Sequence, residues 1–267
     1  MVALTHHYST VKVKTNSKFH PLKTTVCLAA ISHKPELAKH NVAKMRTLKS
    51  MRSSLAGIPI VSMEWILSCI EQNTVVNPQS KHCIQTLQTK VSGWMRIEKD
   101  RSSKAVGGVL HIAAKMRKLQ LLAISNKPTL SFKILRNVVV LTCGVWKRGY
   151  GPKLNDVEVL IRDSGGQLVD NVTNFAKLLS SSKTSKSFLI ICDESESDEE
   201  SGITQFLTRH IVNGPGQSKS IINRIRVVNS SFLFDCISCG ELLGAEEYPP
   251  KSKIGKKLWR ASLEITE

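Results

Sequence analysis

One 13-residue pattern occurs twice in this chain, and this internal repeat limits the possible folds more than any other feature. Residues 58–70, IPIVSMEWILSCI, align without gaps with residues 225–237, IRVVNSSFLFDCI, at an offset of 167. Each copy predicts a short buried strand, a polar N-cap (Ser62 or Asn229) and a helix with an aromatic residue in its first turn. A repeated pattern of this kind indicates one structural unit used twice.

The second half of the chain contains every other part of such a unit. An amphipathic helix is expected from residue 154, and Gly165 and Gly166 are expected to end it. A second strand follows directly in the predicted order β-α-β-β-α-β-α, which describes a small parallel sheet flanked by helices. The other predicted segments are two continuous apolar strands at 137–145 and 187–193, a helix at 203–213 and a fourth strand at 225–228.

The first half predicts the same unit with a weaker beginning. Strands are expected at 1–5 and 24–30, followed by a helix over 42–57 that ends at Gly57. Residues 6–23 contain no glycine pair and predict no convincing first helix, so this unit is divergent or truncated there.

The predicted fold class is therefore α/β, with two similar units that each contain a small four-stranded parallel sheet. The predicted linker is basic and contains one helix. The expected boundaries are 1–84 for the first unit, 85–133 for the linker, 134–248 for the second unit and 249–267 for a basic tail.

Charge indicates the chemistry of a partner. The chain has 38 Lys and Arg against 21 Asp and Glu, a net charge of +17. Such a chain favours a partner rich in phosphate, either a nucleic acid or a phosphorylated protein, and charge alone does not choose between them. DNA could bind through the basic residues of the linker, which are Lys99, Arg101, Lys104, Lys115, Arg117 and Lys118.

Other functional classes have little support in the sequence. None of the GxSxG, HExxH, P-loop or GxGxxG motifs is present, so we expect neither an enzyme, a cofactor nor a small-molecule substrate. Cys236 and Cys239 form a CxxC, but no second pair stands at zinc spacing, so core packing is expected and no metal. No run of 18 apolar residues occurs, so no membrane partner is expected, and the scattered cysteines suit a reducing compartment.

The pattern resembles tandem BRCT repeats, the phosphopeptide-binding modules of DNA-damage-response proteins. GIPIVSMEWI, with Gly57 and Trp65, is similar to the helix–Gly–strand–Trp signature of the family, and Phe232 takes the place of Trp65 in the second copy. DSGGQLVD is similar to the glycine turn after the family's first helix. RTLK, residues 46–49, is similar to the motif that opens the second helix of phosphate-binding members.

The resemblance implies a phosphate site in the first unit. Thr5 stands where the family has a strand-one hydroxyl, His6 where it usually has Gly, and Lys49 where it has the lysine of helix two, with Thr47 beside it. A lysine charge, a hydroxyl and backbone N–H groups at a helix N-terminus are groups that suit a phosphate.

The resemblance also implies a second contact, to the peptide residue at position +3. Arg46 would reach the peptide backbone or a C-terminal carboxylate, and Met51 would line the side-chain pocket. At the same offset of 167, Arg46, Thr47 and Lys49 correspond to Asn213, Gly214 and Gly216, which carry no charge. The second unit is therefore expected to contribute structure and part of the groove.

The leading expectation is a scaffold in the nucleus that binds a phosphoserine peptide or a phosphorylated histone tail during the DNA damage response and repair. The alternative is a module of the same fold that binds DNA or a folded protein without needing a phosphate. The acidic segment at 193–202 is expected to be a solvated loop, with Ser195 and Ser197 as candidate phosphorylation sites.

Overall fold

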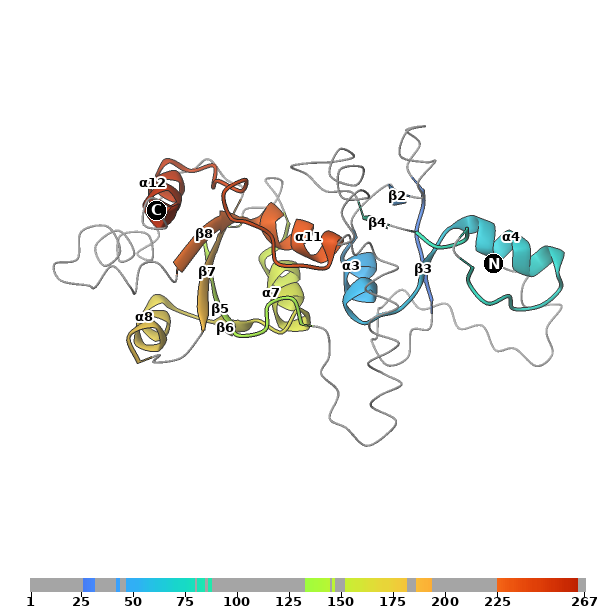
Figure 1. Cartoon of the computed structure of the whole chain (residues 1–267), viewed down its shortest axis with the longest axis horizontal. Coiled ribbons are helices and arrows are strands. Elements are labelled where there is room, and N and C mark those ends of the chain that lie inside the picture. The colour runs from blue at the N-terminus through green and yellow to red at the C-terminus, as the bar shows by residue number, and fades with distance from the viewer. Residues whose placement is uncertain are drawn as a thin grey trace. The chain divides into compact units, whose positions relative to one another are not determined.

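The computed structural model describes residues 26–31, 42–43, 47–79, 81–84, 86–87, 133–144, 146, 152–181, 186–193 and 225–263. The chain divides into two compact units, which are drawn in Figure 1: Met1–Phe132 with Ile237–Gly240, and Lys133–Cys236 with Glu241–Glu267. Both units are mixed α/β structures with parallel strand pairs, as the sequence predicts. Within the described part of the chain, no helix combines the length and the apolar character that a membrane crossing needs.

The second unit is built on one four-stranded parallel sheet. Its strand order is β6-β5-β7-β8, so the first strand of the unit lies between the second and the third. The bounds are β5 (Val138–Cys143), β6 (Gln167–Val169), β7 (Ser187–Cys192) and β8 (Ile225–Asn229). The continuous apolar runs of β5 and β7 predicted strands that are buried on both faces, and the structure confirms it.

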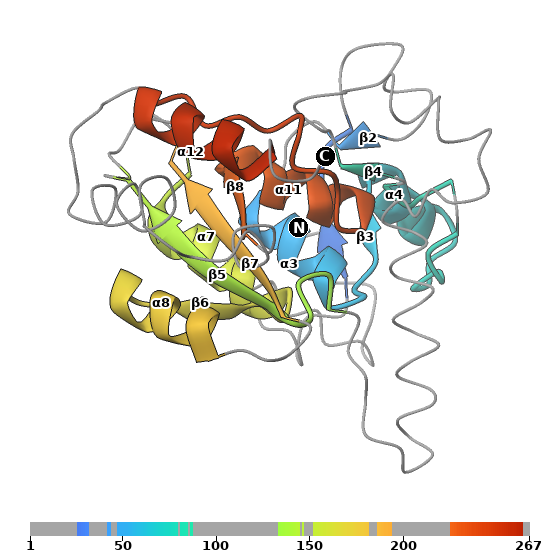
Figure 2. The ribbon, with the colours of Figure 1, turned by 60° about the vertical axis from the view of Figure 1, so that its left-hand side comes forward.

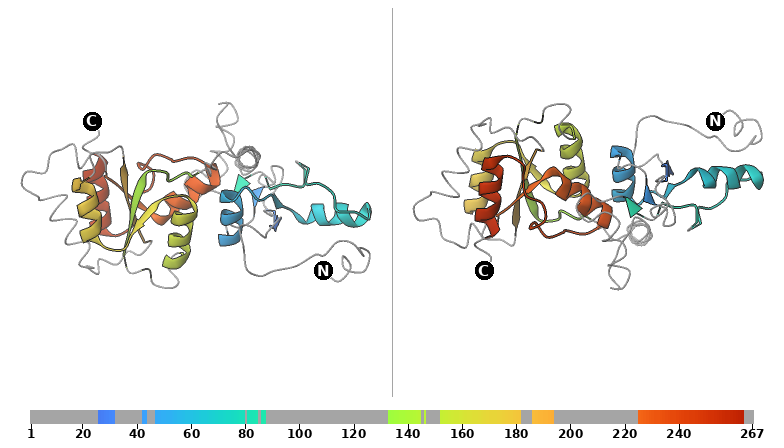
Figure 3. Two further views of the ribbon diagram at one scale, coloured as in Figure 1. Left: turned by 90° about the horizontal axis from the view of Figure 1, so that it is seen from below. Right: turned by 90° about the horizontal axis from the view of Figure 1, so that it is seen from above.

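Two pairs of helices cover this sheet, one pair on each face (Figures 1 and 3). Helices α7 (Leu154–Asp163) and α11 (Ser230–Cys239) lie on one face, and α8 (Val172–Ser181) and α12 (Lys253–Leu263) on the other. Because both faces are covered and successive side chains of a strand point to opposite faces, neighbouring residues of a central strand enter different halves of the core.

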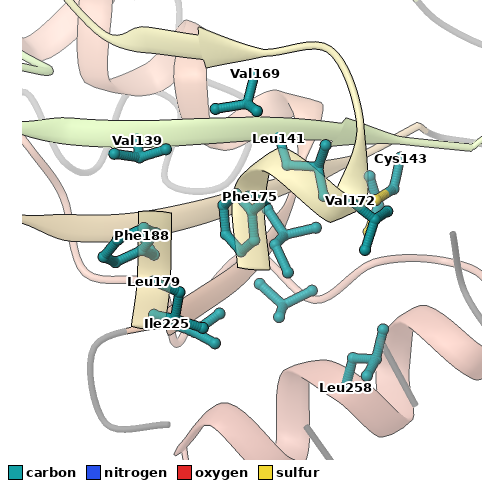
Figure 4. Packing of buried hydrophobic residues seen from close by; sticks show 13 residues of the cluster. Val139, Leu141, Cys143, Val169, Val172, Phe175, Leu179, Phe188, Ile225 and Leu258 are labelled. Atoms are coloured by element: carbon teal, nitrogen blue, oxygen red, sulfur yellow. The ribbon is translucent and has the colours of Figure 1, made fainter. Parts of the chain in front are cut away.

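The core between the sheet and the pair α8–α12 is shown in Figure 4. Phe175 of α8 meets Phe188 of β7 edge to face, with ring centroids 5.4 Å apart. Leu258 of α12 enters the same cluster and is 2% exposed. Burying one side chain of this size contributes about 1.5–3 kcal/mol to folding, so α12 is part of the structural unit.

Two features of the second unit differ from the expectation. Helix α8 lies between β6 and β7, where no helix was predicted. Its apolar residues Val172, Phe175 and Leu179 have helical spacing, and Asn171 caps it by accepting a hydrogen bond from the N–H of Asn174 at 2.8 Å. Residues 249–267, predicted as a basic tail outside the unit, contain α12, which packs against β8. The helix predicted at 203–213 lies outside the described residues.

The first unit contains two short pairs of parallel strands among its described residues. Strand β1 (Cys27–Leu28) pairs with β3 (Ile60–Val61), and β2 (Val42–Ala43) pairs with β4 (Thr86–Leu87). The single four-stranded sheet predicted for this unit is therefore not formed by the described residues, and the strand predicted at 1–5 lies outside them.

Helices α3 (Leu48–Leu55) and α4 (Met63–Glu71) flank β3 along the chain (Figure 2). The predicted helix over 42–57 is too long at its beginning, because α3 begins at Leu48 and residues 42–43 pair as a strand. Its predicted end at Gly57 is confirmed, since the helix stops at Leu55 and Gly57 has a φ of 69°.

The glycine pair that was expected to end the first helix of the second unit does so. Gly165 has a φ of 82°, and its N–H donates to Arg162 O at 3.0 Å while Gly166 N–H donates to Ile161 O at 2.9 Å. This is the Schellman arrangement, in which a left-handed residue reverses the chain after a helix. A Cβ on Gly165 would lie 2.5 Å from the Cβ of Lys133. Both the lack of space and the positive φ angle therefore disfavour any residue other than glycine at this position.

We therefore expect Gly165→Ala to lower the free energy of unfolding of the second unit by at least about 1–2 kcal/mol, the cost of a left-handed conformation for an L-residue. Urea unfolding followed by tryptophan fluorescence measures this. Gly244→Ala is the matched control, because a Cβ there would meet only the mobile end of the Glu246 side chain. Equal urea midpoints of unfolding for the two variants would contradict the requirement for glycine at position 165.

Candidate functional site

The N-terminus of α3 is fixed by a reciprocal pair of side chains. Thr47 is the N-cap, and its Oγ1 accepts from the N–H of Ser50 at 3.1 Å. Ser50 Oγ accepts from the N–H of Thr47 at 3.0 Å, which completes a capping box. The Thr47 hydroxyl donates to Ser50 Oγ at 3.1 Å, so its single proton is already used inside the helix end. In this structure Thr47 therefore sets the start of the helix.

Lys49 lies in the first turn of α3, two residues after the cap, and its side chain is exposed. The first turn contains no acidic residue, so no carboxylate of the helix itself neutralises the partial positive charge of its N-terminus. Backbone N–H groups and a lysine at one helix end are suited to bind an anion.

The location of Lys49 relative to the sheet follows from Cys27 of β1. Burial raises the pKa of the Cys27 thiol, while the nearby Ser53 side chain and the charge of Lys49 act in the opposite direction. Lys49 and Ser53 are four residues apart and share one helix face. This face of α3 therefore lies near β1, and Lys49 stands at its N-terminal end.

The opposite end of α3 is tied to the repeated strand. Gly57 N–H donates to Ser54 O at 3.1 Å and Ile58 N–H donates to Ser53 O at 2.8 Å, the same Schellman arrangement as at Gly165. The chain then enters β3, whose two residues are fully buried. The direction of the helix, and with it the position of Lys49, is thus coupled to a core strand.

Met51, expected to line a pocket for a peptide side chain, is 2% exposed. The structure places it in the protein interior together with Ser50, Ser53, Ser54 and Leu55. Met51 thus belongs to the buried face of α3, and its role in a pocket for the +3 side chain stays a prediction.

The repeated strand–helix pattern has the same local geometry in both units. Cys69 Sγ accepts a hydrogen bond from the N–H of Val76 at 3.4 Å, and Cys236 Sγ accepts one from the N–H of Leu243 at 3.4 Å. Both pairs are seven residues apart, and the pairs themselves are separated by 167 residues. Between the partners, Asn73 and Gly240 adopt positive φ angles of 49° and 73° and end their helices. The equivalence thus extends beyond the 13 aligned residues.

The loop that returns to the strand is also shared. Ser62 N–H donates to His82 O at 2.8 Å, and Asn229 N–H donates to Tyr248 O at 2.9 Å. Each of the two rings is buried against the helix of its own repeat. His82 Nε2 lies 3.1 Å from Ser68 Oγ, and the Tyr248 hydroxyl donates to Asp235 Oδ2 at 3.2 Å.

The aromatic residues of the signature anchor this loop by different means. The indole N–H of Trp65 donates to Val76 O at 2.8 Å, and the ring is half-buried. Phe232 has no such group and instead contacts Tyr248 edge to face, with ring centroids 5.3 Å apart. The predicted N-caps differ too, because Asn229 accepts from Ser231 N–H at 2.9 Å whereas the Ser62 side chain makes no capping bond.

In the second unit a carboxylate lies at the edge of the sheet where β5 and β7 end. Asp193 follows β7 directly, and its N–H donates to Cys143 O of β5 at 3.0 Å. Its carboxylate packs against Gly144, accepts from the N–H of Trp146 at 3.1 Å and is 8% exposed. The end of the first strand of this unit is therefore occupied by a negative charge of the protein itself.

Sequence reasoning missed both Asp193 and His82 as structural groups. An aspartate placed directly after a buried apolar strand was a signal that the strand end carries a polar contact, whereas nothing in the sequence marks His82. Among the described residues no cluster of His, Cys, Asp and Glu suitable for a metal ion is found. The remaining predicted residues lie outside the described part of the chain: Thr5, His6, Arg46, the six basic residues of the linker, Ser195, Ser197, Asn213, Gly214 and Gly216.

Comparison with known proteins identifies the second unit. Residues 133–249 match the family model of the BRCT domain. This segment is a BRCT domain. BRCT domains are in general protein-interaction modules and not enzymes. In this BRCT domain the matched segment ends at residue 249, before α12 begins.

Two solved structures also match parts of the chain at low identity. One is the crystal structure of the BRCT5-BRCT6 domains of S. pombe Brc1, with 18% identity and a TM-score of 0.45 over 81% of this chain and 92% of that one. The other is the crystal structure of yeast Rtt107, with 12% identity and a TM-score of 0.26 over 90% of this chain and 64% of that one. No curated protein matches the chain.

In the BRCT domain two free cysteines stand opposite each other on the central strands, Cys143 on β5 and Cys192 on β7. Burial, with a smaller effect of the Asp193 charge, raises the pKa of the Cys192 thiol from 9.0 to about 12. Burial also raises the pKa of the Cys143 thiol. A thiol with a raised pKa in the folded state stays protonated while the same thiol of the unfolded chain ionises.

We therefore expect these thiols to contribute no pH dependence to the stability of the BRCT domain below pH 8, and to lower it as the pH rises from about 9 towards 12, by up to about 1.4 kcal/mol per pH unit for each thiol. Urea unfolding at pH 7, 9 and 10.5 tests this. Cys192→Ala, measured in parallel, should show a flatter decline. A variant that declines as steeply as the wild type would contradict the contribution of Cys192.

Proposed function

We propose that this protein is a phosphoserine-peptide-binding scaffold of the DNA damage response, acting in the nucleus, with a BRCT repeat in each half. The observation that carries the proposal is the shared geometry of the two strand–helix–loop segments, in which Cys69 matches Cys236 and His82 matches Tyr248. One copy lies inside the matched BRCT domain. The proposal extends the family to the other copy.

The first unit is the proposed site of phosphate binding, because α3 carries Lys49 where the second unit, at the offset of 167, has the uncharged Gly216. In the first unit an exposed Lys49 stands at a helix N-terminus without nearby acidic residues in its turn. In the second unit the Asp193 carboxylate already accepts the N–H of Trp146 at the end of the first strand. A phosphate carries close to two negative charges at neutral pH and would be repelled there.

Within this site Lys49 supplies the charge that holds the phosphate, and Thr47 acts mainly by capping α3 so that its first N–H groups stay fixed. Thr5 and His6 are proposed to complete the phosphate site from the beginning of the chain. Arg46 is proposed to contact the peptide further along, by its planar guanidinium. The ligand would be a phosphorylated protein, for example a histone tail.

We expect Lys49→Glu to weaken binding of a phosphoserine peptide at least tenfold, because a hydrogen bond to a charged group contributes about 1.5–3 kcal/mol and the substituted carboxylate also repels the phosphate. Fluorescence anisotropy with peptides selected from a pooled phosphoserine library measures the effect. The unphosphorylated form of each peptide should bind at least tenfold more weakly to the wild type.

The matched control is Lys177→Glu, which makes the same change of charge on the exposed surface of α8 in the BRCT domain. It should leave peptide affinity unchanged at 150 mM salt, because α8 contributes no residue to the proposed site and salt weakens the general effect of an exposed charge. Equal losses in both variants would show an effect of net charge alone. Binding that does not depend on the phosphate would favour docking of a folded partner and overturn the proposal.

A further inference from the structure

We propose that the outer surface of α12 is a nucleic-acid contact that binds the phosphate backbone of a DNA duplex. This surface, the basic face, consists of Lys253, Lys256, Lys257 and Arg260, all of them exposed. It belongs to the second unit and to a helix beyond the matched BRCT segment. It shares no residue with the site proposed around Lys49.

The four basic residues lie on one side of the helix because of their spacing. At 3.6 residues per turn, positions 253, 256, 257 and 260 fall within an arc of about 100°. The buried residues Gly255, Leu258 and Ser262 fall on the opposite side. The helix is thus divided into a basic half and a half that packs on the BRCT domain (Figure 4, Leu258).

Several contacts hold α12 in place and so fix the direction of the basic face. Leu258 belongs to the core cluster, and the indole N–H of Trp259 donates to Ala245 O at 3.1 Å. At the beginning of the helix Gly255 N–H donates to Ser252 Oγ at 3.0 Å, and a Cβ on Gly255 would lie 2.5 Å from Pro250 Cβ. Cations on an anchored helix bind with a smaller loss of conformational entropy than cations on a free tail.

The basic face is not neutralised by its own helix. No Asp or Glu occurs from residue 248 to residue 263; Glu246 and Glu247, both exposed, precede this segment, and Glu264 follows it in the sequence. Among the described residues, the side chains of Lys256, Lys257 and Arg260 form no ion pair. These three cations are therefore available to a partner.

Charge density favours DNA as that partner. Residues 253 and 260 are separated by about 10.5 Å along the helix axis, and a DNA duplex carries one negative charge per about 1.7 Å of its axis. Each cation can therefore meet a phosphate. Lysine is depleted in protein–protein interfaces, whose centres are apolar, and the large exposed apolar side chains of the described residues all lie outside α12. Lysine-rich contacts position a protein on DNA without reading its sequence.

The test uses the full chain and a fluorescein-labelled 20-base-pair duplex, with anisotropy titrations between 50 and 200 mM salt. We expect the triple variant Lys256→Glu, Lys257→Glu, Arg260→Glu to bind at least tenfold more weakly at 100 mM salt. The slope of log affinity against log salt should fall by about 2.7, since each lost phosphate contact removes about 0.9. The double variant Lys256→Gln, Lys257→Gln should lower the slope by about 1.8. It removes two positive charges without adding negative ones, so its effect cannot come from repulsion by new carboxylates.

The matched control is Arg136→Glu, Lys153→Glu, Lys177→Glu, the same change of net charge spread over exposed positions of the same unit. The slope of log affinity against log salt for this control should differ from that of the wild type by less than about 0.9, the value of one phosphate contact. Equal losses in both triple variants, or an unchanged slope in the α12 variant, would overturn the proposal. Polyglutamate that displaces the duplex at equal charge would also overturn it, in favour of an acidic protein.

The phosphoserine-peptide titration separates this proposal from the previous one. The α12 triple variant should bind the phosphopeptide as the wild type does, and Lys49→Glu should keep the salt slope for DNA within one contact. A loss of peptide binding in the α12 variant would contradict the independence of the two sites. Far-ultraviolet circular dichroism confirms that each variant is folded.

Discussion

The burial of both faces of β5 and β7 is the constraint on which the second unit depends. Parallel strands without a polar face need helices on both sides, because an uncovered apolar face would remain in water. Helices α7 and α11 cover one face, and α8 and α12 the other (Figure 3). The matched BRCT segment ends before α12, so one of the four helices that pack on the sheet comes from residues beyond the match. This requirement also explains why a stretch with five basic residues between 251 and 260 forms a packed helix.

The elements that could be predicted from the sequence are those marked by strong local patterns. The apolar runs of β5 and β7, the glycine turn at Gly165 and the helix end at Gly57 each depend on a few neighbouring residues, and the structure confirms them. Helix α8 was missed because its cap and its three apolar residues lie within one short polar segment. The apolar positions of α12 were hidden among lysines, so their periodicity was read as a charged tail. The beginning of α3 was misplaced because a helical pattern continues through β2.

The candidate site was predictable to a smaller extent, since it depends on which groups lie together in space. Lys49 was singled out through the RTLK motif and lies exposed in the first turn of α3, while its phosphate role stays a prediction. Thr47 turned out to cap the helix by accepting from the N–H of Ser50 while its hydroxyl proton goes to Ser50 Oγ, a role that the motif does not reveal. Met51 is buried, because the face that α3 presents to the interior is set by packing. Asp193 could be recognised as a local anion only once β5 and β7 were known to be neighbours.

The position of α12 has a practical consequence for any fragment of this protein. A segment cut at residue 249, where the BRCT match ends, would lack Leu258 and the Trp259 hydrogen bond to Ala245. The faces of Phe188, Ile190 and Val227 towards α8 and α12 would then be partly uncovered, and an uncovered apolar surface promotes association between molecules. Fragments made for crystallisation or binding studies should therefore extend at least to Leu263. Poor solubility of a shorter fragment would reflect the loss of α12 from one side of its core and would not be evidence against the fold of the complete unit.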